Sequence, residues 1–234
     1  RKSIRRFTTD QIADADRAAI LHAALLAPTA GNQQLYTILD ITDQHLKDSL
    51  AVACDNQPFI AEAPLVLVFC ADHCKWTDAY RVAGCDPRPP GLGDFLLCTL
   101  DATIAAQNAV IAAESLGIGS CYIGDILENR EAVVELLQLP PLVVPVVMVV
   151  FGHPTPAQAD RAHRGRFDAR HIVHENTYRR MDAAELRDMF TDRQGGLEFE
   201  AYLQRFCKRK YNADFSVEMS RSTAEYLEHW TMQP

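Results

Sequence analysis

Basic side chains gather in three short stretches of a chain that is acidic overall. The 234 residues carry 23 Lys and Arg against 31 Asp and Glu, which gives a formal net charge of −8. The guanidinium fork of arginine suits phosphate oxygens, and a hydroxyl such as that of Ser3 adds a neutral donor. We therefore expect local anion sites, although each stretch alone is also typical of a solvated surface. The three stretches are Arg1, Lys2, Arg5 and Arg6; Arg161, Arg164, Arg166 and Arg170; and Arg205, Lys208, Arg209 and Lys210.

The sequence argues against several other ways of binding phosphate. An acidic total disfavours nucleic acid and anionic membranes as partners, because both require a broad positive field. No G-x-x-x-x-G-K-[ST] motif and no G-x-G-x-x-G motif after a strand is present. Side-chain forks and loop amides must then hold any nucleotide.

The cysteines and histidines do not form a pattern that predicts a metal site or a disulfide framework. Cys70, His73 and Cys74 are closely spaced, but no second ligand pair follows, so we expect no metal site. The seven cysteines form an odd set without the framework of a small secreted module. We interpret them as reduced thiols and, with no signal segment recognised, expect a cytoplasmic protein.

Alternating strand and helix patterns must position these residues. Continuous or alternating apolar runs predict strands in "LYTILDIT", "APLVLVFCAD", "GIGSCYIGD" and "VVPVVMVVFGHP", the last with Pro145 near its beginning. Helical spacing predicts a helix that ends near Pro28, another in "NREAVVELLQL", and a long one over residues 94–117. Such alternation indicates an α/β or α+β sheet domain.

The long helix is rich in small residues. Its alanines predict close packing, deep in the fold or across a dimer interface. Polar residues within it argue against a membrane span, namely Asp101, Gln107, Asn108 and Glu114.

Several segments together resemble the FMN-dependent nitroreductase family, especially its oxygen-insensitive NADPH nitroreductases and flavin reductases. They are "RKSIRRFT", "APTAGNQQ", "NQPFIAEAP", "GIGSCYIGD", "RGRF", "IVHENTY" and "DFSVEMSRS". The resemblance covers essentially the whole chain. It implies an α+β fold with a central, mainly antiparallel sheet flanked by helices. A core over residues 1–182 and a C-terminal helical extension over residues 183–234 are expected, in a homodimer.

The resemblance also implies which residues bind FMN. The phosphate is expected at Arg1, Lys2, Ser3, Arg5, Arg164, Gly165 and Arg166. The flavin ring is expected at Thr29, Asn32, Gln57, Tyr122, Ile123, Gly124 and Asp125. Relatives often have glycine where this chain has Asp125, so we expect its backbone amide to face the flavin and its carboxylate to turn away.

By the same resemblance, the cofactor carries the chemistry and no side chain is assigned as an acid or base. NADPH, or NADH, is expected to reduce the flavin, which then reduces a nitroaromatic, a quinone or a similar flat electrophile in a ping-pong cycle. Alternatives are an NADPH-dependent reductase of free FMN, and a flavin-binding sensor or partner protein with little turnover. Lys208 and Arg209 are expected to meet the adenosine 2′-phosphate of NADPH, unless they only cap a solvated helix end.

Overall fold

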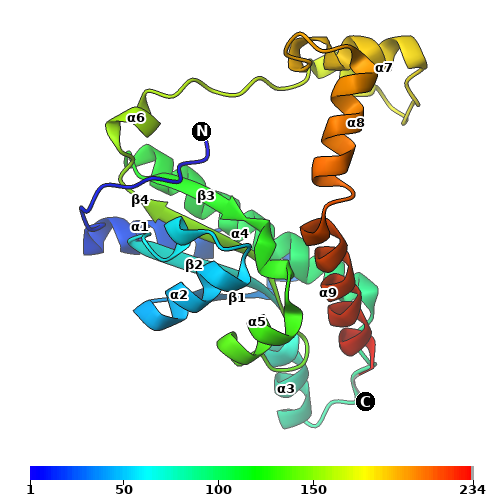
Figure 1. Ribbon diagram of the computed structural model, residues 1–234. Coiled ribbons are helices and arrows are strands. Elements are labelled where there is room, and N and C mark those ends of the chain that lie inside the picture. The colour runs from blue at the N-terminus through cyan, green and yellow to red at the C-terminus, as the bar shows by residue number, and fades with distance from the viewer. Residues whose placement is uncertain (233–234) are drawn as a thin grey trace. The chain divides into compact units, whose positions relative to one another are not determined.

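Four antiparallel strands form the central sheet of the larger of two units. The computed structural model describes residues 1–232 as two units, Arg1–Arg161 with the chain from Glu218 onward, and Ala162–Val217. In the first unit the strand order is β1-β2-β4-β3 and every neighbouring pair is antiparallel. The α+β fold with a mainly antiparallel sheet is thus confirmed (Figure 1). The strands are β1 (Tyr36–Asp40), β2 (Leu65–Asp72), β3 (Gly119–Ile123) and β4 (Val143–Gly152).

The central strand β4 contains a proline that its partner strand accommodates. Phe69 of β2 pairs with Val147, whereas the next residue, Cys70, pairs with Pro145, so the register shifts by one residue. Proline has no N–H to donate to a ladder, and an irregularity is where a sheet tolerates it. This explains how Pro145 lies two residues inside the strand.

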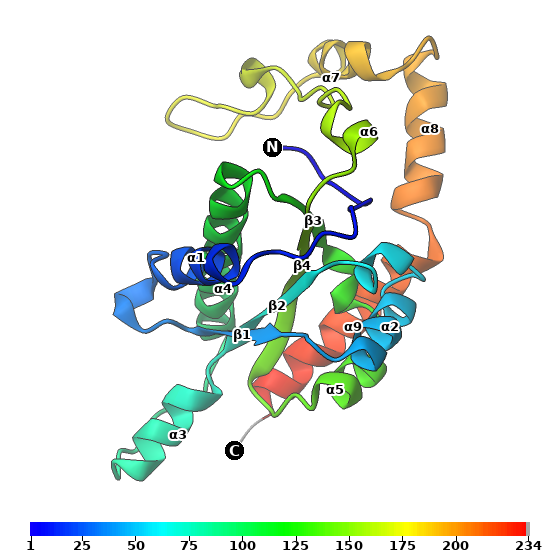
Figure 2. The same ribbon diagram turned by 90° about the vertical axis from the view of Figure 1, so that its left-hand side faces the viewer.

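Helices cover both faces of the sheet (Figure 2). Alternate residues of β2 face opposite ways, so Leu67 joins the core beneath α1 (Asp14–Leu25) and α4 (Leu92–Ser115). Val68 joins the core beneath α2 (Gln44–Ala53) and α5 (Arg130–Leu137). All eight residues of β2 are buried, as expected for a strand enclosed between two helical layers.

The alanines of α4 face the protein's own core. Ala102, Ala105 and Ala109 are fully buried in the cluster formed with α1 and the sheet. Of the two partners that the sequence left open for these small residues, the protein's own core is the one they pack against. The exposed side of α4 carries larger apolar residues instead, Leu96, Leu100, Ile104 and Ile111. By length and composition alone α4 could cross a membrane, but its buried face makes it a core helix of this sheet.

The C-terminal helix α9 (Asp214–Thr231) ends in the first unit. Trp230 is 1% exposed and its ring packs edge-on against Phe95, with centroids 5.1 Å apart. Shorter helices complete that unit: α3 (Cys74–Val82) and α6 (Pro156–Ala159).

The second unit contains a cluster of aromatic rings. Phe190, at the end of α7 (Ala183–Phe190), lies 5.1 Å from the ring of Phe167 and 6.0 Å from that of Phe199, where α8 (Phe199–Lys210) begins. Asp182 caps α7 by accepting hydrogen bonds from Ala184 N and Glu185 N. The division of the chain at residue 182 stays a prediction.

Candidate functional site

The basic N-terminal segment lies along strand β3. Ser3 forms a parallel bridge with Ser120, and Ile4 N donates to the Ser120 carbonyl at 2.9 Å. Arg161 also donates from Nη2 to the carbonyl of Ser3. Sequence positions more than 100 residues apart are thereby brought to one strand, which the order of motifs alone did not predict.

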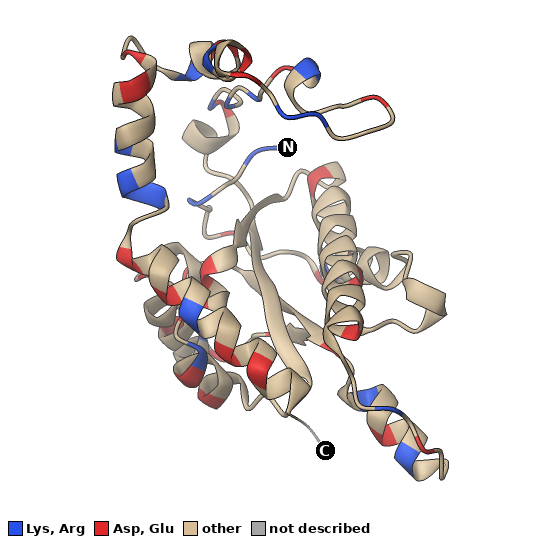
Figure 3. Ribbon diagram, turned by 90° about the vertical axis from the view of Figure 1, so that its right-hand side faces the viewer, with Lys and Arg blue, Asp and Glu red and all other residues tan. Residues whose placement is uncertain are grey.

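The cations of this segment surround the same strand. The guanidinium of Arg1 lies over the Tyr122 ring at 5.1 Å, and that of Arg5 lies over the Phe59 ring at 5.9 Å. Burial raises the pKa of the Cys121 thiol, and the positive charges of Arg5 and Arg1 oppose that rise. Figure 3 shows this concentration of basic residues at the start of the chain.

Lys2 uses part of its hydrogen-bonding capacity within the chain. Its Nζ donates to the carbonyls of Ala159 and, at 2.7 Å, of Arg161. An ammonium group has three N–H donors, so one remains for a ligand.

The loop that carries Thr29 and Asn32 is tied to helix α4 by a carboxylate. Asp101 is 3% exposed, and its two oxygens accept from Ala30 N at 2.9 Å and Leu35 N at 3.1 Å. Thr29 Oγ1 accepts from Gln34 N at 2.7 Å, which closes the loop on itself. The sequence pattern does not indicate Asp101 as a site residue, because its partners lie about 70 residues away in the chain.

Gln57 and the turn after β3 meet directly. Gln57 Nε2 donates to Asp125 Oδ2 at 2.7 Å and to the Cys54 carbonyl at 2.8 Å. The carboxylate of Asp125 is therefore directed at the amide of another predicted flavin contact. Tyr122, which precedes this turn, donates its hydroxyl to Gln107 Oε1 at 3.0 Å.

A second carboxyl, which the sequence analysis missed, lies beside Asp125. Glu128 is 3% exposed, and its Oε1 has no partner among the described residues. Burial raises the pKa of Glu128 to about 7, and the neighbouring Asp125 contributes to the rise through its charge and through a hydrogen bond. The spacing Asp-x-x-Glu carries no signal of its own, so only the folded chain reveals this pair.

The remaining predicted residues lie in the second unit. Arg193 holds the "RGRF" segment, since its guanidinium stacks on Phe167 at 3.6 Å and donates to the Gly165 carbonyl at 3.4 Å. Arg164 and Arg166 are exposed, and Arg166 Nη1 donates to the Arg164 carbonyl at 3.3 Å.

Lys208 and Arg209 are exposed in the last turn of α8, where the helix dipole favours cations. The position fits the solvated-helix alternative as well as a phosphate contact.

The donor set of the first unit fits a flavin nucleotide. Cations suited to a phosphate lie where the N-terminal segment pairs with β3, and the amide of Gln57 lies at the turn that follows the same strand. A Cβ added to Gly124 would meet no atom within 4 Å, so the turn faces open space. Thr29 and Asn32 lie in a separate loop for which the structure gives no direct contact to the other predicted residues.

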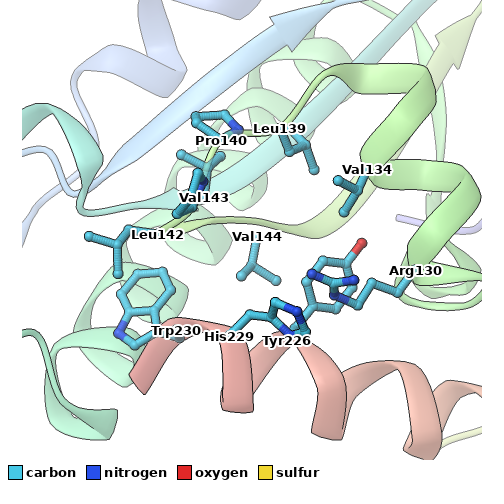
Figure 4. A pocket seen from close by; sticks show the side chains of 11 residues that line it. Arg130, Val134, Leu139, Pro140, Leu142, Val143, Val144, Tyr226, His229 and Trp230 are labelled. Carbon is cyan, nitrogen blue, oxygen red and sulfur yellow. The ribbon is translucent and has the colours of Figure 1, made fainter. Parts of the chain in front are cut away.

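Two cavities of the first unit lie apart from these residues. One of about 220 Å³ lies between α5, β4 and α9 and is lined by Arg130, Val134, Val144, Tyr226 and Trp230, among others (Figure 4). The other, of about 440 Å³, is lined by residues that include His73, Tyr80, Arg88 and Asp94. None of the predicted flavin contacts lines either cavity.

Comparison with known proteins places the chain in a family. The model of the nitroreductase family matches residues 1–153. An oxygen-insensitive NADPH nitroreductase of Salmonella typhimurium is 38% identical over 183 residues, which is 77% of this chain and 72% of the relative. An FMN reductase [NAD(P)H] of Bacillus subtilis is 31% identical over 234 residues, covering 97% of this chain and 88% of the relative.

Solved structures of similar proteins support the same family assignment. The NADPH:FMN oxidoreductase of Vibrio harveyi, solved with NAD⁺, superposes with a TM-score of 0.79 at 27% identity and covers 97% of this chain and 94% of its own. A nitroreductase of B. subtilis superposes with a TM-score of 0.77 at 28% identity, with 94% and 95% of the two chains covered. The chain therefore belongs to the nitroreductase family.

Proposed function

We propose that the protein is an FMN-dependent NAD(P)H oxidoreductase that reduces nitroaromatics, quinones or related flat electrophiles. The observation that carries the proposal is the convergence on β3: the basic segment pairs with the strand at Ser120, and Gln57 meets the turn that follows it at Asp125. The relatives named as NADPH nitroreductase and FMN reductase support the same activity.

In this proposal each segment of the site has one task. Arg1, Lys2, Ser3 and Arg5, with Arg164, Gly165 and Arg166, hold the FMN phosphate through charge-assisted hydrogen bonds. Thr29, Asn32 and Gln57 orient the ring, together with Tyr122 and Ile123 at the end of β3 and Gly124 and Asp125 in the turn that follows. When bound, FMN supplies hydride chemistry between the nicotinamide and the acceptor. The chain's own contribution is to place the ring and to stabilise charge with fixed dipoles, so no side chain is required as an acid or base.

The acceptor distinguishes this function from its alternatives. Steady-state oxidation of NADPH is measured with nitrofurazone, with menadione and with added FMN. Turnover with the first two supports the proposed oxidoreductase, and turnover only with added FMN supports a flavin reductase. A yellow protein with bound FMN and no turnover with any of them would indicate a flavin-binding sensor or partner protein.

NADPH is the proposed electron donor, with Lys208 and Arg209 as contacts of its 2′-phosphate. Changing both to Ala is expected to raise the KM for NADPH and leave NADH turnover nearly unchanged, because only NADPH carries that phosphate. Equal losses with both donors, or equal use of both by the wild type, would show that the cluster only caps α8.

A homodimer is part of the proposal, with the exposed apolar face of α4 as the contact. Leu96, Leu100 and Ile111 are 59%, 55% and 58% exposed on this core helix. Replacing Leu100 and Ile111 with Glu should give monomers in sedimentation velocity, whereas replacing the exposed Val52 of α2 with Glu should not. A dimer that survives the double substitution would remove this face of α4 from the contact.

A further inference from the structure

The cavity of about 220 Å³ between α5, β4 and α9 combines apolar walls with one permanent cation. Its walls include Val134, Leu142 and Val144, and Arg130 is the only Lys or Arg among the described residues that line it. Figure 4 shows the side chain of Arg130 reaching from α5 to the ring of Tyr226 on α9. A cavity of about 150 Å³ can hold benzene, so this one has room for a six-membered ring that carries one further small group.

The charge of Arg130 is not neutralised within the described part of the chain. Its guanidinium forms no ion pair there, because Glu131, which follows it, and Glu218 both pair with Arg221, at 2.8 Å. Arg130 Nε is buried without a hydrogen-bond partner among the described residues. The contact that the guanidinium does make is with the Tyr226 ring, at 5.3 Å. An aromatic ring attracts a cation without cancelling its charge, so Arg130 remains able to pair with an anion.

Two other donors among the lining residues are also unpaired. Tyr226 is 3% exposed and Trp230 is 1% exposed, yet the Tyr226 hydroxyl and Trp230 Nε1 have no hydrogen-bond partner among the described residues. Burial raises the pKa of the Tyr226 hydroxyl, so it keeps the proton that it can donate. A guanidinium and an indole N–H can only donate, and a buried donor without an acceptor costs free energy. These side chains therefore favour a ligand that brings acceptor atoms and a negative charge.

We propose that this cavity binds a small monocarboxylate with an apolar body, an aromatic acid of about the size of benzoate. The carboxylate pairs with the guanidinium of Arg130 and accepts a second hydrogen bond from the Tyr226 hydroxyl. The ring lies against apolar wall residues such as Leu142 and Val144. A phosphate dianion is disfavoured, because one cation among apolar walls would leave much of its charge unpaired. None of the predicted flavin contacts lines the cavity, so this site is separate from the proposed function.

Trp230 reports binding in the cavity directly. The chain has two tryptophans, and Trp76 lies in α3 and does not line this cavity, so Trp76→Phe leaves one tryptophan, in the cavity wall. Benzoate is added to the FMN-loaded Trp76→Phe protein while tryptophan fluorescence and flavin absorbance are recorded. We expect a saturable change in the fluorescence of Trp230. Unchanged fluorescence would overturn the site, and a change in flavin absorbance alone would show that benzoate binds only at the flavin.

The fluorescence titration does not depend on the proposed function. A protein that holds no FMN, or that has no turnover, would contradict the proposed function and leave the fluorescence of Trp230 as the measure of this cavity.

A comparison of ligands tests the charge without changing the cavity. Benzamide has nearly the shape of benzoate but no charge, so it should bind at least about tenfold more weakly. Sodium phosphate at the same ionic strength should leave the fluorescence of Trp230 unchanged. Equal affinity for benzoate and benzamide, or a saturable response to phosphate, would overturn the assignment to a monocarboxylate.

Two variants in the Trp76→Phe protein test the contacts. Arg130→Met removes the charge from a side chain of similar length and should weaken benzoate binding at least about tenfold. Arg81→Met, the matched control, removes an exposed cation that pairs with Asp78 at 3.6 Å and should not change the affinity. Tyr226→Phe keeps the buried ring and should weaken binding by about fivefold.

Each variant has an outcome that contradicts the proposal. Undiminished affinity in Arg130→Met would overturn the pairing of the carboxylate with Arg130, and undiminished affinity in Tyr226→Phe would overturn the second hydrogen bond. If Arg130→Met does not fold, Tyr226→Phe and the comparison of benzoate with benzamide still decide the proposal, because neither removes a charged group from the chain.

Discussion

Gly119 and Gly152 face each other across strands β3 and β4, and the basic N-terminal segment lies over both. Directly paired residues of an antiparallel ladder point to the same side of the sheet. A Cβ on Gly119 would lie 2.6 Å from Ile4 Cγ1, and one on Gly152 would lie 2.7 Å from the ring of Phe7. The pair thus forms a flat seat that lets the segment carrying Arg1 and Arg5 approach the sheet.

A side chain at Gly152 should weaken FMN binding, although Gly152 itself is not a predicted FMN contact. In Gly152→Ala the added methyl group overlaps Phe7 and Pro64, so the segment must move, at a cost of about 1–3 kcal/mol in unfolding free energy. The proportion of FMN retained after gel filtration should fall together with the urea midpoint. Gly93→Ala, where the methyl group meets nothing within 4 Å, is the matched control. If both variants retain FMN equally, the seat does not position the phosphate site.

The raised pKa of Glu128 predicts how stability depends on pH. Burial and Asp125 raise the pKa of Glu128 from 4.5 to about 7, so between these values the folded chain binds the proton more tightly than the unfolded chain. This contribution to the unfolding free energy is complete below about pH 4.5 and is lost as pH rises towards 7. Urea unfolding at a series of pH values should show that decline in the wild type and a smaller one in Glu128→Gln. Identical pH profiles would contradict the assignment.

The hydroxyl of Tyr226 adds no protein hydrogen bond where it is buried. Tyr226 is 3% exposed, its hydroxyl has no partner among the described residues, and its ring lies 5.3 Å beneath the Arg130 guanidinium. Tyr226→Phe should therefore change the unfolding free energy by less than about 1 kcal/mol, or raise it. Trp230→Ala, one turn later, should cost about 3–5 kcal/mol, because it removes a fully buried ring. A loss above about 2 kcal/mol in Tyr226→Phe would show that the hydroxyl stabilises the fold.

The sequence predicted what depends on local pattern and missed what depends on distant partners. The run "APLVLVFCAD" gave β2, and the long apolar helix gave α4 to within two residues at each end. Helix α2 was not predicted, although Asp43 caps it by accepting from Leu46 N at 2.8 Å. Small residues such as Ala109 indicated close packing but not whether the partner was the same chain or a second one. The role of Asp101 arises from partners about 70 residues away, and that of Glu128 depends on its burial in the folded chain, so sequence spacing predicts neither.

Asp101 should control the loop that carries Thr29 and Asn32. Each carboxylate oxygen accepts one backbone N–H, from Ala30 and Leu35, inside a site that is closed to solvent. In Asp101→Asn one oxygen becomes an amide group that faces a backbone N–H, which leaves buried donors unpaired at a cost of about 1–3 kcal/mol. The loop should then be cleaved faster in limited proteolysis, and FMN should bind more weakly if Thr29 and Asn32 contact it.

Two comparisons separate these effects. Glu62→Gln removes an exposed carboxylate without touching the loop, so its proteolysis and FMN affinity should match those of the wild type. Asp101→Asn with faster cleavage but unchanged FMN affinity would mean that the loop does not contact the flavin. If Asp101→Asn also leaves the rate of proteolysis unchanged, Asp101 does not hold the loop. Two backbone donors cannot lose an acceptor in a buried site without loosening the segment between them.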